Sequence, residues 1–185
     1  MKRLLFSILL VSLSLAASAQ KVAIQSNIIS LLDFGTLNAE AGISVAQHLS
    51  LHLGGKYNPW SFNLESPSLQ IKDQHKVYYA GVRYWPWYVF SDWWISTKVE
   101  YLDFLQTGVW RPAVESGRGV GIGLGFGYTK MLNKHFNLDL GVGCIGGWLF
   151  DYTLNNSQNY SSIRDSGERH FIYPDGIQVG IMYVF

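Results

Sequence analysis

The chain has 185 residues, enough for one domain, and is 48% hydrophobic, 15% aromatic and 15% charged, with a formal net charge of +1. A near-neutral chain without a basic cluster argues against nucleic-acid binding. The single cysteine, Cys144, excludes an intramolecular disulfide. After the first residues, no run of about 20 apolar residues could form a transmembrane helix, so the high apolar content favours strands that face lipid on one side.

The first 19 residues have the three parts of a secretory signal peptide. Lys2 and Arg3 form a positive start, residues 4–15 an apolar stretch, and residues 17–19 a small-residue cleavage site. No cysteine follows that site, so lipid attachment there is not expected. We therefore expect residues 1–19 to be removed. The mature domain, 20–185, then has 12 Lys and Arg against 13 Asp and Glu, a net charge of −1.

Eight runs of alternating apolar and polar residues follow the signal peptide. Successive side chains of a strand point to opposite faces, so each run predicts a strand with one apolar face. None of the runs has helical periodicity. The sequence therefore predicts an all-β fold, an eight-stranded antiparallel up-and-down transmembrane β-barrel. The runs cover residues 22–32, 37–46, 49–60, 76–86, 93–105, 118–131, 136–153 and 170–185.

The connections between the runs alternate in length. Those at 47–48, 87–92 and 132–135 are short, whereas three others are longer and polar. Outer-membrane barrels have short periplasmic turns and longer extracellular loops. Residues near 61–75, 106–117 and 154–170 are therefore expected to face outside. Only the first connection, near the sequence DFGT, is short where a long one is expected.

The sixth run, GVGIGLGFGYTK at residues 119–130, has glycine at every second position from 119 to 127. Such spacing scatters glycine around a helix, where each costs about 1 kcal/mol against alanine. On a strand, the large residues share one face and the glycines the other. We expect the large residues to face lipid. The glycines then face a narrow interior and leave room for large side chains from other strands.

Aromatic residues gather near the ends of the runs, as the two interfaces of a bilayer favour. The chain ends in Tyr183-Val184-Phe185, an ending similar to that of outer-membrane barrels, in which Phe185 would seat the last strand. A soluble β-sandwich or a lipocalin-like barrel remains the alternative, because lipid-facing and core-facing alternation look alike. The inner aromatic group is Trp85, Trp87, Tyr88, Phe90, Trp93 and Trp94, and the outer group is Tyr57, Trp60, Phe62, Trp148, Phe150 and Tyr152.

The segments KVAIQSN (21–27), GGKYNPWSF (54–62) and VRYWPW (82–87), with the glycine-alternating strand and the aromatic C-terminus, carry a family resemblance. In these features the whole mature chain resembles the domain of unknown function 3575 family, small β-barrel proteins predicted for outer membranes of gut Bacteroidetes. The resemblance implies no catalytic residues, because the family has no assigned activity. Some members are encoded beside genes for fimbrial proteins, which implies an accessory role in surface fibres. This chain departs from the family pattern in its compact first loop and single cysteine.

Motifs that could carry chemistry are few. GVGCIG at 141–146 matches a dinucleotide fingerprint, but it lies inside an alternating strand rather than at a strand-to-helix turn. Ser50 and His52 alternate with His48 on one inward face, as a lipid acyl hydrolase could use them, but no orienting carboxylate is adjacent in sequence. Glu168 and His170 are isolated, so no metal site is expected. No catalytic residue and no cofactor is expected from the sequence either.

Six charged residues fall on faces opposite the apolar ones. On the lipid side at the middle of a bilayer, Lys or Arg would cost about 2–4 kcal/mol, so pairing inside the barrel is the cheaper arrangement. A sealing ion-pair network is the favoured interpretation, and a gated conduction path or a substrate site is the alternative. These residues are Glu40, Lys56, Arg83, Lys98, Glu100 and Asp139.

Three functions remain open from the sequence. The favoured one is a non-enzymatic barrel of the cell outer membrane with a packed interior, whose loops dock a surface partner. The alternatives are an enzyme that modifies outer-membrane lipid through Ser50 and His52, and a narrow pore. The expected partners are outer-membrane lipid, the barrel-assembly machinery and a fimbrial or other surface protein, with no nucleic acid.

Overall fold

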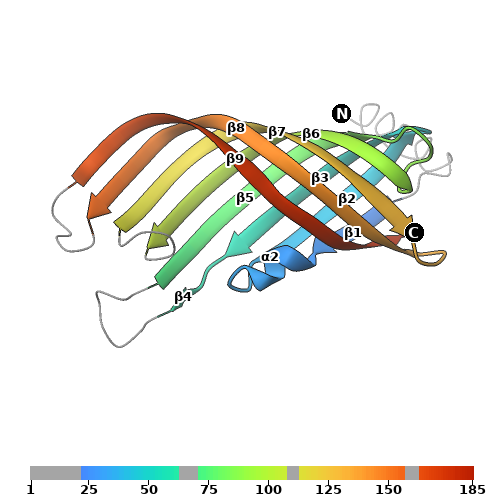
Figure 1. The fold of residues 1–185 in the computed structure, drawn as a ribbon, viewed down its shortest axis with the longest axis horizontal. Coiled ribbons are helices and arrows are strands. Elements are labelled where there is room, and N and C mark those ends of the chain that lie inside the picture. Colours follow the sequence, from blue (N-terminus) through green and yellow to red (C-terminus); the bar gives the residue numbers. More distant parts are fainter. Residues whose placement is uncertain (1–21, 63–70, 108–112, 157–162) are drawn as a thin grey trace, which may run out of the picture.

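The computed structural model describes residues 22–62, 71–107, 113–156 and 163–185. Over these residues the chain forms eight antiparallel strands in a closed ring, with one short additional strand and one short helix (Figure 1). The all-β, up-and-down prediction is confirmed. The expected signal peptide lies outside the described residues. No helix among the described residues is long and apolar enough to cross a membrane.

Each strand of the ring pairs with its neighbours along the chain, and β1 closes the ring against β9. The additional strand, β4, pairs only with the start of β5. Phe185 takes part in the closure, because its backbone N–H donates to the carbonyl oxygen of Val22 at 2.9 Å. The strands are β1 Val22–Asn27, β2 Leu37–Ala46, β3 Leu49–Asn58, β4 Ser61–Phe62, β5 Ile71–Tyr84, β6 Asp92–Thr107, β7 Ala113–Met131, β8 Phe136–Asn156 and β9 Ile163–Val184.

The wall of the ring is uneven in height. Strand β1 has 6 residues and β2 and β3 have 10 each, whereas β7, β8 and β9 have 19, 21 and 22. The long strands therefore reach well beyond the short ones (Figure 1). They take up much of what the sequence predicts as outer loops, because β5 begins at Ile71, β7 at Ala113 and β9 at Ile163.

The prediction of one strand over residues 22–32 is wrong, because Ile28–Leu32 form a helix, α2. Asn27 caps this helix by accepting a hydrogen bond from the backbone N–H of Ile29 at 3.0 Å. The same Asn27 side chain accepts from the N–H of Val179 and donates to the carbonyl of Ile177 on β9. The connection from β1 to β2 therefore runs over residues 28–36. It is longer than expected from the sequence.

The outward and inward faces of the strands differ as the alternation predicts. Large apolar side chains point outward around the ring and are exposed. The prediction for the outer aromatic group is partly wrong, because Tyr152 points inward and is buried. A register shift between Leu149 and Tyr152 adds one residue to β8 and so exchanges the inward and outward positions beyond it. Phe62 lies where no side chain is described. Exposed apolar residues include Ile24, Ile43, Leu53, Val99, Ile122, Leu124, Val142 and Ile177.

Two apolar clusters fill the interior. The first closes the end at which β1 begins and β9 ends. Trp85, Phe90 and Trp94 of the predicted inner aromatic group belong to it, whereas Trp87, Tyr88 and Trp93 are exposed. The second lies toward the far end of β7, β8 and β9, the long strands that form the tall wall of the ring. The interior is therefore packed rather than a wide channel. The first cluster is Ala23, Trp85, Phe90, Trp94, Met182 and Val184, and the second is Ile145, Leu149, Tyr152 and Phe171.

Candidate functional site

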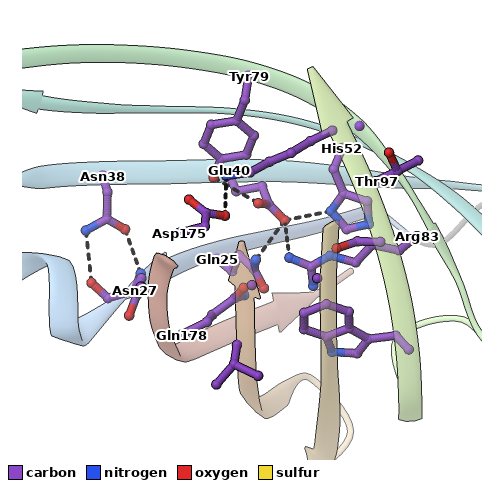
Figure 2. A pocket seen from close by; sticks show the side chains of 18 of the residues that line it. Gln25, Asn27, Asn38, Glu40, His52, Tyr79, Arg83, Thr97, Asp175 and Gln178 are labelled. Carbon is purple, nitrogen blue, oxygen red and sulfur yellow. Dashed lines mark hydrogen bonds and ion pairs between the residues drawn. The ribbon is translucent and has the colours of Figure 1, made fainter. Parts of the chain in front are cut away.

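Between the two apolar clusters the interior is polar, and its centre is a buried network around Glu40, Arg83 and Asp139 (Figure 2). Alternation along β2, β5 and β8 points these three side chains inward, and closure of the ring brings the strands round to face one another. The Arg83 guanidinium donates to Glu40 Oε1 and to Asp139 Oδ2, each at 2.8 Å. One cation thus bridges two carboxylates across the interior.

Each carboxylate also has three further donors. Glu40 accepts from Gln25 Nε2 and His52 Nδ1, both at 2.7 Å, and from the Tyr79 hydroxyl at 2.9 Å. A buried carboxylate is tolerable when it is both paired and fully hydrogen-bonded, which is the case here. Figure 2 shows these side chains converging on Glu40 from β1, β3 and β5.

Asp139 also accepts from three donors besides Arg83, and it is 0% exposed. Its other donors are the Trp94 indole at 2.7 Å, the Thr129 hydroxyl at 2.7 Å and the Gln178 amide at 2.6 Å. The Arg83 guanidinium carbon lies 4.4 Å from the Trp94 ring centroid, within cation–π distance. The network therefore cross-links β1, β2, β3, β5, β6, β7, β8 and β9.

A second charged group surrounds Lys98. Its Nζ lies 2.7 Å from both Glu100 Oε2 and Asp175 Oδ2, and 4.5 Å from the Tyr79 ring centroid. Lys56 lies 3.8 Å from the other oxygen of Asp175. All six charged residues predicted to point inward therefore do so, and they pair with one another and with Asp175.

Asp175 was missed by the sequence reasoning. It is the extra residue of a bulge, because Cys144 pairs with Pro174 while Gly143 pairs with Gly176. Gly176 has a φ of +91°, a conformation that favours glycine. In sequence, Pro-Asp-Gly resembles a turn. The other missed members are neutral donors, namely Gln25, Tyr79, Trp94, Thr129 and Gln178, which no motif singles out.

Ser50 and His52 have no carboxylate adjacent in sequence, but the fold brings Glu40 of β2 to His52. The Ser50 Oγ is 2.7 Å from His52 Nε2, and His52 Nδ1 is 2.7 Å from Glu40. With Nδ1 donating to Glu40, Nε2 accepts the Ser50 proton, which is the arrangement of a serine nucleophile and its base.

The Ser50 hydroxyl is buried within the described structure. Ser50 is 0% exposed, and its oxygen already accepts a hydrogen bond from the Trp85 indole at 2.8 Å. A cavity of about 80 Å³ reaches Glu40, His52, Arg83 and Lys98, but Ser50 does not line it. Among the described residues, the Ser50 hydroxyl thus completes a buried hydrogen-bond chain and faces no space that a substrate could enter.

The other sequence motifs have simple places in the fold. Residues 141–146 lie within β8, so the dinucleotide fingerprint lacks its turn and helix. Glu168 and His170 are exposed on β9. The glycines of β7 face large side chains as predicted: a Cβ at Gly127 would meet the Trp94 ring, and one at Gly119 would meet Leu149. On β8, a Cβ at Gly141 would also meet the Trp94 ring.

Comparison with known proteins identifies the family to which the chain belongs. No curated protein and no solved structure matches the chain. The family described as "Protein of unknown function (DUF3575)" matches residues 5–185, which is nearly the whole sequence and includes every strand of the ring. The resemblance drawn from the sequence is confirmed, and the chain belongs to the DUF3575 family.

Proposed function

We propose that this protein is a small β-barrel of the cell outer membrane, with a sealed interior, whose tall wall holds a binding surface outside the cell. The observation that carries the proposal is the outward face of the ring. Large apolar residues cover it, and between the aromatic residues at the two ends no Asp, Glu, Lys or Arg of the described strands points outward. A soluble ring has no need of such a band, whereas a lipid-facing one requires it.

The height of the band supports the same proposal. On β6, about ten residues separate the exposed Trp93 from Asp103, and about ten separate Tyr128 from Arg118 on β7. At about 3.3 Å per residue and a tilt of about 40°, these stretches span about 25 Å, the height of the apolar band of outer-membrane barrels.

A row of outward charges bounds the band at the end away from Val22 and Phe185. Lys76, Asp103, Arg118 and Asp151 are register partners on β5, β6, β7 and β8. Their signs alternate around the wall, and the Arg118 guanidinium bonds the Asp151 carboxylate. Charges at this level fit lipid headgroups and water, whereas they would be costly at the bilayer centre.

The helix α2 fits the wall of a lipid-embedded ring. It stands where β1 has ended, and its residues IISLL are all apolar except Ser30. Backbone groups cannot remain unpaired in hydrocarbon, and a helical turn pairs its own. The Asn27 side chain supplies the two bonds that β9 lacks at the end of the β1 ladder.

The sealed interior favours a scaffold over the two other functions. Conduction would have to cross the cluster of Trp85, Phe90 and Trp94 and then the Arg83 bridge. Lipid hydrolysis would need access to Ser50, which is buried. A scaffold needs only the rigid wall and the surface beyond the band, and loops or strand ends on rigid scaffolds commonly carry binding. A fimbrial or other surface protein remains the expected partner.

A spin label on Cys144, the single cysteine, can test the membrane placement directly. Cys144 is exposed on the outward face of β8, level with Leu124 in the apolar band. We expect a nitroxide attached to Cys144 of protein in lipid vesicles to be highly accessible to oxygen and poorly accessible to a water-soluble nickel chelate, because oxygen partitions into hydrocarbon. Electron paramagnetic resonance power saturation measures both.

The matched control moves the label to the tall wall. Cys144→Ser combined with Ser166→Cys places it on an exposed position of β9 beyond the band. There the nickel chelate should gain access and the oxygen preference should disappear. Equal chelate access at the two positions would mean that the ring is a soluble protein, and the proposal would be withdrawn.

A further inference from the structure

The charges of the polar interior do not balance. The two charged groups described above contain four carboxylates but three cations, so the described residues leave one negative charge in excess. A buried charge without an opposite charge is costly, so the excess favours one further positive charge in this part of the interior. The carboxylates are Glu40, Glu100, Asp139 and Asp175, and the cations are Lys56, Arg83 and Lys98.

His52 does not supply that positive charge. Its Nδ1 lies 2.7 Å from Glu40 Oε1, and its Nε2 lies 2.7 Å from the Ser50 oxygen, which accepts the Trp85 indole N–H. The Ser50 proton therefore points to His52 Nε2, which can accept it only when the imidazole is neutral. The excess negative charge of the interior remains.

The cavity of about 80 Å³ lies beside this excess charge, and Glu40, Tyr79, Asp175 and Gln25 are among the side chains around it (Figure 2). Gln25 is 6% exposed, and its Nε2 donates to Glu40 Oε1 at 2.7 Å. Its Oε1 has no hydrogen-bond partner among the described residues. A buried acceptor left unpaired costs free energy. A donor with a positive charge would therefore satisfy both this oxygen and the excess charge.

We propose that this cavity binds a small protonated amine, either an ammonium ion or a short primary alkylammonium. The cavity has room for several water-sized groups, since each needs about 10–15 Å³. An ammonium group carries only donors, and the cavity offers it acceptors besides Gln25 Oε1. Glu40 Oε2 accepts from the Tyr79 hydroxyl at 2.9 Å, and Asp175 Oδ1 has only a distant contact with Lys56 Nζ, at 3.8 Å.

Metal ions and anions fit this cavity less well than an amine. In the described part of the chain, no three acidic, histidine or cysteine side chains form a group that could hold a metal ion. A divalent ion would also exceed the single excess charge. Lys56, Arg83 and Lys98 line the cavity too, but each is already paired with a carboxylate. An anion would therefore add to the negative excess.

Side-chain exposure shows how the amine reaches the cavity. The side chains of Lys56 and Asp175 are 24% and 20% exposed, whereas those of Arg83 and Asp139 are 5% and 0% exposed. The cavity therefore opens at the level of Lys56 and is closed toward the first apolar cluster. Binding requires no opening of that cluster, and the proposal does not depend on the membrane placement.

The test measures thermal unfolding of the mature chain in micelles, with the ionic strength held constant by choline chloride. Choline is too large for the cavity and has no N–H donor. Replacing it with ammonium or methylammonium should raise the unfolding midpoint in a saturable way, because a ligand of the folded state stabilises it by mass action. The apparent dissociation constant should be at least tenfold lower for ammonium than for potassium, which donates no hydrogen bond. Equal effects of ammonium and choline, or of ammonium and potassium, would overturn the proposal.

Gln25→Lys identifies the site, because it supplies a covalently attached ammonium group beside Glu40. This variant should lose the response to ammonium. The control Gln106→Lys should keep it, because Gln106 bonds to Asp73 and does not line the cavity. A response that persists in Gln25→Lys, or that disappears in both variants, would contradict the assignment.

A second measurement uses the unmodified chain, so the proposal can be tested even where Gln25→Lys does not fold. Bound ¹⁵N-labelled ammonium should give a nuclear Overhauser effect to the side-chain amide protons of Gln25. Absence of that effect at an ammonium concentration that saturates the midpoint would place the bound amine elsewhere and overturn the proposal.

Discussion

At the scale of single residues, Arg83 is the group on which the interior depends most. It is 4% exposed and lies between two buried carboxylates. Among the described residues, their one other cationic partner is His52, which counts only when protonated. Moving such a charge out of water is costly, and the cost is offset only while all partners remain. Loss of Arg83 would leave Glu40 and Asp139 as two uncompensated negative charges.

We predict that Arg83→Met lowers the free energy of unfolding by about 3–5 kcal/mol, the range for breaking one side of a buried ion pair. Urea titration of the refolded protein in micelles measures it. The control is Arg118→Met, because Arg118 pairs with Asp151 on the exposed outer face and such surface pairs contribute little. Equal stability of Arg83→Met and the unmodified chain would contradict a structural role for the network.

The sequence predicts which charges point inward but not their partners. Alternation alone places Glu40, Arg83 and Asp139 on inward faces, because the side-chain period of a strand is two. Which of them meet depends on register and closure, which bring together residues 43 and 56 positions apart. Alternation does not show that Tyr152 and Asp175 point inward, since one extra residue in a strand reverses the faces beyond it.

At the scale of elements, β7 shows how a glycine face determines packing. Its glycines lie against bulky side chains of both neighbouring strands, β6 and β8. Trp94 occupies the space beside Gly127 and Gly141, and Leu149 that beside Gly119. This prediction succeeded because it needed no register: an alternating glycine face inside a narrow ring can only make room for large residues.

We predict that Gly127→Ala destabilises the protein by about 1–3 kcal/mol, the usual cost of overpacking. A Cβ there would press against both the Trp94 ring and the carbonyl oxygen of Leu140, and that backbone oxygen cannot move aside cheaply. Gly146→Ala is the matched control, because its Cβ would have ordinary contacts with Ile172 at 3.6 Å and Phe171 at 3.7 Å. Thermal unfolding in micelles compares them, and equal midpoints would refute the packing argument.

The helix α2 marks the limit of prediction from periodicity. Five residues are too few to show a helical period, and IISLL following an alternating run continues a strand pattern equally well. What ends the strand is Asn27, whose side chain caps the helix and also bonds to β9, 150 and 152 residues away in sequence. That second role exists only once the ring has closed.

At the scale of the whole molecule, the ring is closed at one end and uneven at the other. The end at which β1 begins and β9 ends is filled by Trp85, Phe90 and Trp94, and the Arg83 bridge lies next to that cluster. The opposite end rises on one side only, where β7, β8 and β9 are longer than β1, β2 and β3 (Figure 1). The sequence predicts strand number and closure, but it underestimates the tall wall, because polar strand ends resemble loops.

Two successive barriers make a clear prediction about conduction. We expect the unmodified protein to give no conductance steps in a planar bilayer, because eight strands enclose a space that side chains can fill. Phe90→Ala alone should also be silent, since the Arg83 bridge still spans the interior. The combination Phe90→Ala with Arg83→Ser opens a gap in both barriers and should produce steps, provided that heat-modifiable mobility on a gel shows the variant to be folded. Conductance by the folded, unmodified protein would favour the narrow pore instead, and the interior charges would then line its path.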